Sequence, residues 1–424
     1  MKGFFPTTER DSPRARIPRC GLCGLYHGCK NPKMQVTGDG EKGVLIIAEA
    51  PGREEDKQGI QLIGTSGQLF REILGEIDID LERDCWKTNA LICWPGEGNP
   101  TPTSRRIGYC RPNLMKTIEE LQPRVIVLLG GVAVESLIGV LWKESVGAIG
   151  RWVGWKIPCQ RLNSWICPTY HPAYLARTND PVLRIWFKRH IKAAFELDGS
   201  PWKADFKSAL EGDMGEVDEN GDPIVDACNM PPRYQRNVFQ LYEPKEVVET
   251  VDEIIGLNGP VAFDYETTSL KPEVDGADIV CCAISVGCND TFVYPWVGEV
   301  IEATSRLLKS KCPKIAANLK FEERWTRAKL GHGVNNWAWD TMQAAHVLDN
   351  RPGITGLKFQ SFVQLGQESY DDHIKPYLQT GANGLNRIHE LNLGDLLMYC
   401  GMDALLEYEL AMKQMEQLGV KRNE

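Results

Sequence analysis

No apolar run in this sequence approaches the roughly 20 residues that a membrane-spanning helix requires. The N-terminus also lacks the long apolar core and the cleavage site of a secretory signal, and the chain has no internal repeat or low-complexity tract. These absences argue against a membrane partner and predict a cytoplasmic protein. In that reducing compartment, the 14 cysteines are expected as thiols or metal ligands and not as disulfides.

The composition is that of an ordinary globular protein, with 42% hydrophobic and 25% charged residues, and the length of 424 residues predicts two or three domains. The net charge of −9 is unevenly spread. Residues 1–200 hold 27 lysines and arginines against 22 acidic residues, whereas residues 201–424 hold 21 against 35. An acidic protein can still bind DNA through a local basic surface, so charge alone does not reveal a nucleic-acid partner.

The first 200 residues alternate short apolar runs with helical stretches, which predicts an α/β domain with a parallel sheet. The expected strands are Val44–Ile47, Val125–Leu129 and Trp165–Cys167. Asp180 and Pro181 suit the N-cap and the first position of a helix, and they predict a helix that continues to Leu197.

Residues 201–240 are expected to form a solvated linker, because eight acidic residues and one lysine lie between Asp205 and Asp226 among few large apolar residues. A second α/β domain is expected over residues 241–424. Its predicted strands are Val261–Phe263, Ile279–Val286 and Thr291–Tyr294. Its predicted helices are Glu302–Lys311, Phe321–Leu330, Asp340–Leu348 and, as the longest, about Leu393–Leu418.

Four acidic residues of the second domain predict a metal site. Asp264 and Glu266 lie two residues apart at the end of an apolar strand, so their side chains share one face. Glu322 lies early on a helix, and Asp403 shares a helix face with Tyr399, four residues earlier. Carboxylates suit two Mg²⁺ or Mn²⁺ ions, and such a pair about 3.5–4 Å apart clamps both reacting oxygens of a phosphodiester. The sequence therefore predicts hydrolysis of nucleic acid.

Cysteines in the first domain predict a second metal centre. Cys20 and Cys23 form a C-x₂-C pair, and Cys93 and Cys110 follow 17 residues apart in a segment rich in Pro and Gly, which predicts a loop. Four thiolates hold either zinc or an iron–sulfur cluster. The rival ligands are Cys29 and Cys85, and the cysteines expected as small core residues are Cys159 and Cys167.

The second domain resembles the proofreading 3′–5′ exonuclease domain of family A DNA polymerases, of the DEDD type with a tyrosine in the third motif. The matching segments are Phe263-Asp264-Tyr265-Glu266-Thr267, Asn318-Leu319-Lys320-Phe321-Glu322, Asp340-Thr341-Met342 and Tyr399-Cys400-Gly401-Met402-Asp403. The resemblance implies a ribonuclease H-like fold with a mixed sheet, and metal binding by the four acids. It also implies that Tyr399 orients the attacking water and that Asn318 and Lys320 contact a single-stranded 3′ end. Glu322 stands where the family usually has aspartate, and its longer side chain still reaches a metal, directly or through water.

Residues 17–195 resemble the family 4 uracil-DNA glycosylases, which carry an iron–sulfur cluster. The matching segments are Ile46 to Asp56, Thr88-Asn89, Val127 to Gly130 and His171 to Leu175. The resemblance implies an α/β/α sandwich with a parallel sheet over residues 1–200. It also implies a structural [4Fe–4S] cluster, whose ligands match Cys20, Cys23, Cys93 and Cys110.

The same resemblance implies roles in uracil excision for other residues. His171 would stabilise the charge that grows on the leaving base, Asn89 would hydrogen-bond the uracil edge, and the loop of Glu49 would place the attacking water. The base must first leave the stack, and Tyr174 or Leu175 would fill the gap.

Departures from the glycosylase pattern leave three hypotheses open. Ala48 replaces the usual glycine, Leu62 replaces an aromatic residue that stacks on uracil, and the basic residues usual after Asn89 are missing. The first hypothesis is a DNA enzyme with two activities, 3′–5′ hydrolysis and uracil excision. The second is an exonuclease whose first domain only binds DNA or a polymerase partner. The third, a zinc-bound replisome scaffold without catalysis, leaves the four carboxylates without a use.

The pairing of the two domains resembles the front part of certain bacteriophage family A DNA polymerases. This resemblance implies a bacterial host cell and a DNA polymerase as partner. The chain ends where a polymerase domain would begin and has no palm or fingers motifs. We therefore expect the polymerase either in cis, in a longer chain, or in trans, as a separate polypeptide.

Overall fold

The computed structural model describes residues 20–203, 234–287, 290–381 and 383–420, and the chain divides into two compact units, Met1–Pro231 and Pro232–Glu424. Most of the expected linker, residues 204–233, lies outside the described residues. Its last part is structured: Tyr234–Asn237 form the 3₁₀ helix η3, and Val238–Gln240 form strand β6, which pairs with a strand of the second unit. None of the described helices is long and apolar enough to cross a membrane.

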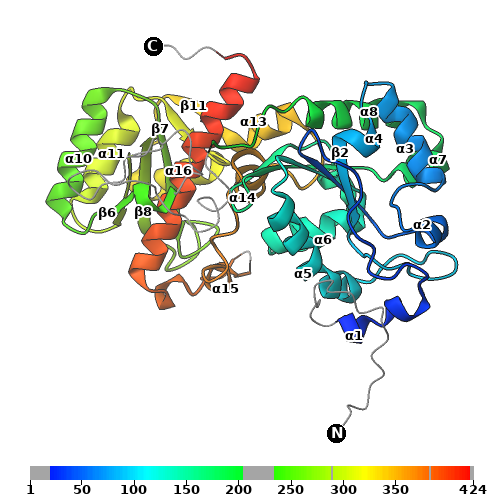
Figure 1. The fold of residues 1–424 in the computed structure, drawn as a ribbon. Coiled ribbons are helices and arrows are strands. Elements are labelled where there is room, and N and C mark those ends of the chain that lie inside the picture. The colour runs from blue at the N-terminus through cyan, green and yellow to red at the C-terminus, as the bar shows by residue number, and fades with distance from the viewer. Residues whose placement is uncertain (1–19, 204–233, 288–289, 382, 421–424) are drawn as a thin grey trace, which may run out of the picture. The chain divides into compact units, whose positions relative to one another are not determined.

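A five-stranded sheet in the order β2-β1-β3-β5-β4 forms the centre of the first unit (Figure 1). The strands are β1 (Val44–Ala48), β2 (Cys85–Asn89), β3 (Val125–Leu129), β4 (Ile157–Cys159) and β5 (Ser164–Thr169). The three predicted strands are confirmed as β1, β3 and β5. The sheet is parallel as expected, except that β4 pairs antiparallel with β5 at one edge.

Helices pack on both faces of this sheet (Figure 1). The helices of this unit are α1 (Cys20–Cys23), α2 (Arg53–Gln58), α3 (Thr65–Gly75), α4 (Leu81–Asp84), α5 (Ser104–Leu121), α6 (Gly131–Leu141), α7 (Pro172–Thr178) and α8 (Pro181–Phe195), and its 3₁₀ turns are η1 (Leu25–Gly28) and η2 (Ile149–Arg151). Val44 and Ile46 pack with α3 and α8, whereas the alternate residue Leu45 is equally buried on the other face. The α8 helix begins as predicted, because the Asp180 side chain accepts hydrogen bonds from the first turn. These layers confirm the predicted α/β/α sandwich.

The second unit contains a six-stranded mixed sheet in the order β11-β10-β7-β8-β9-β6. The remaining strands are β7 (Val261–Thr267), β8 (Ile279–Gly287), β9 (Asp290–Pro295), β10 (Lys314–Ala316) and β11 (Trp337–Asp340). The antiparallel continuation predicted from the sequence is confirmed, because β7 pairs antiparallel with β8 and β8 with β9. One expectation is corrected: Asp264 and Glu266 lie within β7, not at its end, since pairing with β8 extends the strand through Thr267.

The helices and turns of this unit are α10 (Pro244–Leu257), α11 (Val300–Lys309), α12 (Lys320–Leu330), α13 (Thr341–Leu348), α14 (Leu357–Gln360), the π-helical turn η4 (Ser361–Leu365), α15 (Lys375–Leu378), η5 (Ile388–Glu390) and α16 (Leu393–Gln417).

Alternation of side chains along β7 places its apolar residues on one face of the sheet and its acids on the other. Phe263 and Tyr265 join the core formed with α10, α11 and α12. The opposite face, which holds Asp264 and Glu266, is covered by α16, the long helix drawn in orange to red in Figure 1.

Candidate functional site

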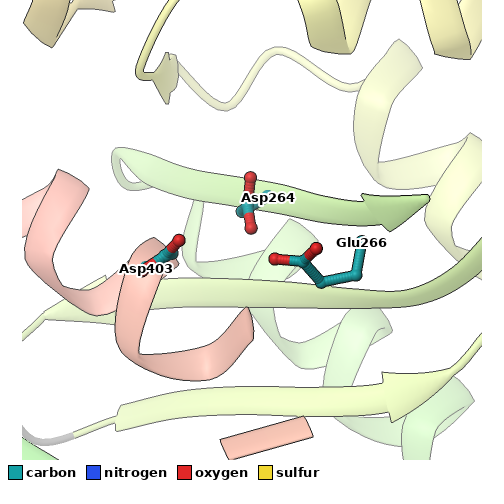
Figure 2. Close-up of side chains that lie close together, drawn as sticks. All are labelled: Asp264, Glu266 and Asp403. Carbon is teal, nitrogen blue, oxygen red and sulfur yellow. The ribbon is translucent and has the colours of Figure 1, made fainter. Parts of the chain in front are cut away.

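Three carboxylates of the second unit come together between β7 and α16. Asp264 and Glu266 extend from β7 toward Asp403 of α16 (Figure 2), and one oxygen of each lies within 4.8 Å of the others. The two strand residues share this face because side chains alternate along a strand. Hard oxygen donors from three side chains form a coordination set of the kind that Mg²⁺ and Mn²⁺ prefer.

The electrostatics of this group favour a cation. Burial raises the pKa of Asp264 well above its usual value, and the neighbouring Asp403 raises it further. Burial likewise raises the pKa of Glu266, with Asp264 as the next contributor. Asp264 Oδ2 is buried and has no hydrogen-bond partner among the described residues. Like charges held close together in a poorly hydrated place are costly, and a divalent ion relieves that cost.

Lys358 of α14 contacts the carboxylate group, and no sequence motif indicated it. Its Nζ donates hydrogen bonds to Asp403 Oδ1 and, at 2.7 Å, to the Tyr370 hydroxyl, which itself donates to Asp403 Oδ1. The ammonium group also lies 4.1 Å from the centre of the Tyr370 ring and 4.3 Å from that of Tyr399. Lys358 therefore supplies a positive charge at one side of the three acids, held between two aromatic faces.

Tyr399 lies one helical turn before Asp403, as the spacing predicts. Burial raises the pKa of its hydroxyl well above the usual value, and Asp403 is the next contributor. The hydroxyl therefore stays protonated at neutral pH and is able to donate a hydrogen bond.

Glu322 lies apart from the tight group of three, so the expected convergence of four acids is correct only in part. It occupies the first turn of α12, is 2% exposed, and one of its oxygens has no partner among the described residues. Its pKa is raised by burial and then by Asp264, which places its carboxyl near that of Asp264. A further buried acid that the sequence analysis missed, Glu407, lies one turn after Asp403 on α16. Its spacing of four residues from Asp403 was the available signal.

Asn318 and Lys320, expected to contact a DNA strand, lie at the entrance to α12. The backbone N–H groups of Asn318 and Leu319 donate to the two carboxylate oxygens of Asp340, at 3.1 and 3.2 Å. Asn318 adopts a left-handed backbone conformation with φ 64°, which asparagine tolerates, and the Lys320 side chain is exposed. Their contact with DNA stays a prediction.

In the first unit, three predicted site residues lie at the carboxyl ends of parallel strands, where α/β sheets commonly bind ligands. Asn89 ends β2 in register with Ala48 of β1, Glu49 follows β1, and His171 follows β5. Burial raises the pKa of Glu49, and Arg177 opposes this shift. Asn89 is buried, and its Nδ2 has no hydrogen-bond partner among the described residues. A buried amide donor without a partner is a physical reason to expect a ligand there.

His171 is the N-cap of α7, and its Nδ1 accepts a hydrogen bond of 3.1 Å from the Ala173 N–H. Burial and, to a lesser extent, the positive charge of Arg177 together lower the pKa of His171 to about 4. The ring is therefore neutral at pH 7. Since Nδ1 acts as the acceptor, the proton resides on Nε2, which becomes the available donor.

The remaining predicted residues of the first unit differ in exposure. Tyr174 is 42% exposed, and its ring lies 5.6 Å from that of Tyr170. Leu175 is instead 5% exposed and packs in the core, so it is not available to fill a gap in a DNA stack. Leu62 is 6% exposed, packs in the same core, and has a left-handed backbone conformation with φ 55°. Of the two residues expected to enter the stack, only Tyr174 has the required exposure.

The predicted thiol ligands come from separate segments. Cys20 and Cys23 form α1, which packs on α5, and Cys93 lies in the loop after β2. Cys110 lies inside α5 and not in the loop that the sequence predicts. The helix already begins at Ser104, and Thr103 is its N-cap. Burial raises the pKa of Cys93 to about 12, and the next thiol contribution comes from Cys29.

Of the rival ligands, Cys29 adjoins this thiol group and Cys85 does not. Cys110 belongs to the predicted group, since the thiols of Cys23 and Cys20 act on its pKa. By contrast, the groups that act on the pKa of Cys85 are acids and lysines and include no thiol. Among the described residues, no three of these sulfurs approach within 4.8 Å of one another. Cys159 and Cys167 are buried as expected.

Comparisons with known proteins find a separate family model for each unit. Residues 35–196 match the family model of the uracil DNA glycosylase superfamily, and residues 236–418 match that of a 3′–5′ exonuclease. The chain is 33% identical to the type-4 uracil-DNA glycosylase of Pyrobaculum aerophilum over 184 residues, which is 42% of this chain and 89% of that protein. It is 23% identical to the DNA polymerase of Bacillus phage SP01 over 396 residues, which is 90% of this chain and 41% of that polymerase.

Among solved structures, the crystal structure of Escherichia coli RNase D is similar with a TM-score of 0.34 and 10% identity, over 42% of this chain and 44% of that chain. Each family model matches one unit alone, whereas the phage polymerase matches residues of both units. The chain therefore belongs, through its first unit, to the type-4 uracil-DNA glycosylase family, and its second unit is a 3′–5′ exonuclease domain like those of family A DNA polymerases.

Proposed function

We propose that this chain is a DNA enzyme with two activities. Its second unit hydrolyses phosphodiester bonds at the 3′ end of single-stranded DNA, and its first unit excises uracil. The observation that carries the exonuclease is the gathering of Asp264, Glu266 and Asp403 within 4.8 Å. The similarity to a phage DNA polymerase over 90% of the chain supports a polymerase partner, in cis or in trans.

The acidic residues of the second unit would hold two Mg²⁺ or Mn²⁺ ions. Bound ions of this kind stabilise the attacking and leaving oxygens of the phosphodiester. Asp264, Glu266 and Asp403 provide oxygen ligands, and Glu322 adds a carboxylate close to Asp264. The protonated Tyr399 hydroxyl orients the attacking water by a hydrogen bond. Asn318 and Lys320, at the start of α12, would position the 3′-terminal strand.

The exonuclease is tested with 5′-labelled single-stranded DNA that contains no uracil, in Mg²⁺. Asp264→Ala removes an acid central to the group, and we expect the rate of 3′ shortening to fall by more than about 100-fold. The matched control is Asp275→Ala, since Asp275 is exposed and lies outside the carboxylate group. Full activity of Asp264→Ala would refute the assignment.

The first unit would cleave the bond between uracil and deoxyribose. Glu49, whose pKa is raised by burial, accepts a proton from the water that attacks the sugar carbon. As the glycosidic bond breaks, its electrons remain on uracil, and His171 Nε2–H donates to the negative charge that develops on the base oxygen. Asn89 Nδ2, which has no partner among the described residues, donates to a carbonyl of the base.

Uracil excision is tested in EDTA, which stops a metal-dependent exonuclease while glycosidic hydrolysis needs no added ion. Single-stranded DNA with one uracil is incubated with the protein and then treated with alkali, which breaks the strand at abasic sites. Breaks at uracil that disappear in Asn89→Leu would support excision. Binding without any breaks would favour a domain that only binds DNA. Leu62 would explain that outcome, because it packs in the core and replaces the aromatic residue that stacks on uracil in the family.

The thiols of the first unit would hold a [4Fe–4S] cluster with a structural role. Cys20, Cys23, Cys93 and Cys110 match the ligand positions, and the similarity to type-4 uracil-DNA glycosylases supports a cluster over a single zinc ion. Anaerobically purified protein is expected to be brown and to contain about four irons per chain. A colourless protein with one zinc would contradict this assignment.

A further inference from the structure

An exposed apolar stripe runs along α8 of the first unit, and the proposed reactions leave it without a role. Val182, Ile185 and Trp186 are 57%, 52% and 50% exposed. Arg189 lies one turn after Ile185 and is also exposed. The spacing of three and four residues places these side chains on one face of the helix. The Arg189 guanidinium lies over the Trp186 ring, 5.3 Å from its centre, so this face presents an aromatic ring with a positive charge beside it.

Two other basic residues of α8 are paired with acids of α3. Arg184 forms ion pairs of 2.8 and 2.5 Å with Glu72 and Glu76, and Lys188 forms one of 2.9 Å with Glu76. Among the described residues, Arg189 has no acidic partner. Its charge is therefore available to an anionic ligand.

A row of four rings connects the exposed face of α8 to the candidate glycosylase site. The members of this aromatic row are, in order, Trp186, His190, Tyr170 and Tyr174, and successive ring centres are 6.1, 6.4 and 5.6 Å apart. The fold holds the middle of the row in place, because His190 Nδ1 lies 3.1 Å from Thr169 Oγ1 at the end of β5. Tyr170 is the next residue of the chain, and His171 follows it. The row thus starts on α8 and ends beside the residue that the proposed reaction places against uracil.

The two ends of the aromatic row are its exposed members, since Trp186 is 50% and Tyr174 is 42% exposed. Exposed rings with a cation close by are typical of surfaces that bind single-stranded nucleic acid, because every base has a face that stacks and every phosphate is negative. A protein partner would require only the apolar stripe. The available charge of Arg189 and the continuity of the row with His171 favour a DNA strand instead.

We propose that the aromatic row and Arg189 bind the single-stranded DNA that flanks the uracil on one side. Bases stack on Trp186 and Tyr174, a phosphate pairs with Arg189, and the rings of His190 and Tyr170 fix the distance between the two stacking positions. This inference rests on the proposed uracil excision and deepens it, because it makes single-stranded DNA the preferred substrate. In a duplex, the flanking bases are paired and stacked on one another and do not present their faces to the protein.

The test measures uracil excision by the full chain in EDTA on two single strands with a central uracil, one of about 20 nucleotides, which exceeds a typical site for single-stranded DNA, and one of only three. For Trp186→Ala we expect KM on the longer strand to rise at least about 5-fold with kcat unchanged, the effect of one lost stacking contact. KM on the trinucleotide should not change, because that substrate is too short to reach α8. Trp186→Phe retains a ring and should bind the longer strand nearly as the wild-type protein does. Trp186→Leu keeps apolar area without a ring and should bind as weakly as Trp186→Ala.

The control is Tyr242→Ala, which removes a 53% exposed ring of the second unit and should leave both KM values unchanged. A KM of Trp186→Ala that is unchanged on the longer strand, or that rises equally on both substrates, would overturn the inference. Wild-type binding by Trp186→Leu would also overturn it, because the stripe would then act through apolar contact alone.

A wild-type protein that excises no uracil from either substrate would refute the excision proposal, and photochemical crosslinking then decides the inference separately. Single-stranded DNA in which 5-iodouracil replaces thymine is irradiated with the protein in EDTA, and the crosslinked peptides are identified by mass spectrometry. Crosslinks at Tyr174 or Trp186 would support the aromatic row as a DNA-binding surface. Crosslinks confined to the second unit would refute it.

Discussion

Lys358 provides a sharp test of how the second unit tolerates its buried acids. Lys358→Met keeps an unbranched apolar stem between the Tyr370 and Tyr399 rings and removes the positive charge. Asp403 then loses its only basic partner among the described residues, and Asp264 and Glu266 remain beside it. We therefore expect a large loss of stability when no divalent ion is present.

The magnitude follows from burial. The side chains of Lys358 and Asp403 are 25% and 10% exposed, so the ion pair lies mostly out of water. Removal of one partner from a buried pair costs about 3–5 kcal/mol, and partial exposure places this case near the lower value. For a unit of this size, about 3 kcal/mol corresponds to a fall in Tm of roughly 6–12 °C.

Thermal unfolding of the full chain, followed in EDTA and in excess Mg²⁺, checks this expectation. Since Lys358 and a divalent ion compete for Asp403, the gain in Tm on adding Mg²⁺ should be larger in Lys358→Met than in the wild-type protein. The control is Lys309→Met, which alters an exposed lysine of α11. A variant that melts within about 1 °C of the wild-type protein in EDTA, or gains no more from Mg²⁺, would refute the reasoning.

Other predictions concern the remaining residues of the two sites. The rate of uracil excision should fall as the pH decreases through the raised pKa of Glu49, because only the ionised carboxylate accepts a proton. His171, with a pKa of about 4, should cause no loss of rate between pH 6 and 8. A pH–rate profile that is flat down to pH 4 would contradict the role of Glu49. Cys93→Ser should lose the iron and the brown colour while Cys29→Ser keeps both, as measured by iron content, and equal loss in the two variants would contradict the ligand set. Tyr399→Phe should slow 3′ shortening by roughly 10- to 100-fold, the effect of one hydrogen bond to a charged or reacting group, and an unchanged kcat would exclude its role in orienting water.

Much of the fold follows from local pattern. The continuous apolar run Val125–Leu129 predicts a strand buried on both faces, and the structure confirms it as β3. Asp180 and Pro181 predict the start of α8 because the side-chain cap and the fixed backbone angle of proline act within one turn. Local pattern failed where pairing partners decided the outcome: β7 continues through Asp264 and Glu266 because β8 supplies hydrogen bonds along its whole length.

The sequence by itself determined which chemical groups this protein offers: two acids at strand spacing, a Tyr399–Asp403 pair at helical spacing, and a C-x₂-C pair. These depend on distances of a few residues, which backbone geometry converts directly into shared faces. The tertiary structure alone decided that Lys358, 45 residues from Asp403, places its ammonium on that carboxylate. It also decided that Glu407 retains a free oxygen beside the site. Such pairings depend on how a helix packs across a sheet, and no short-range pattern encodes that packing.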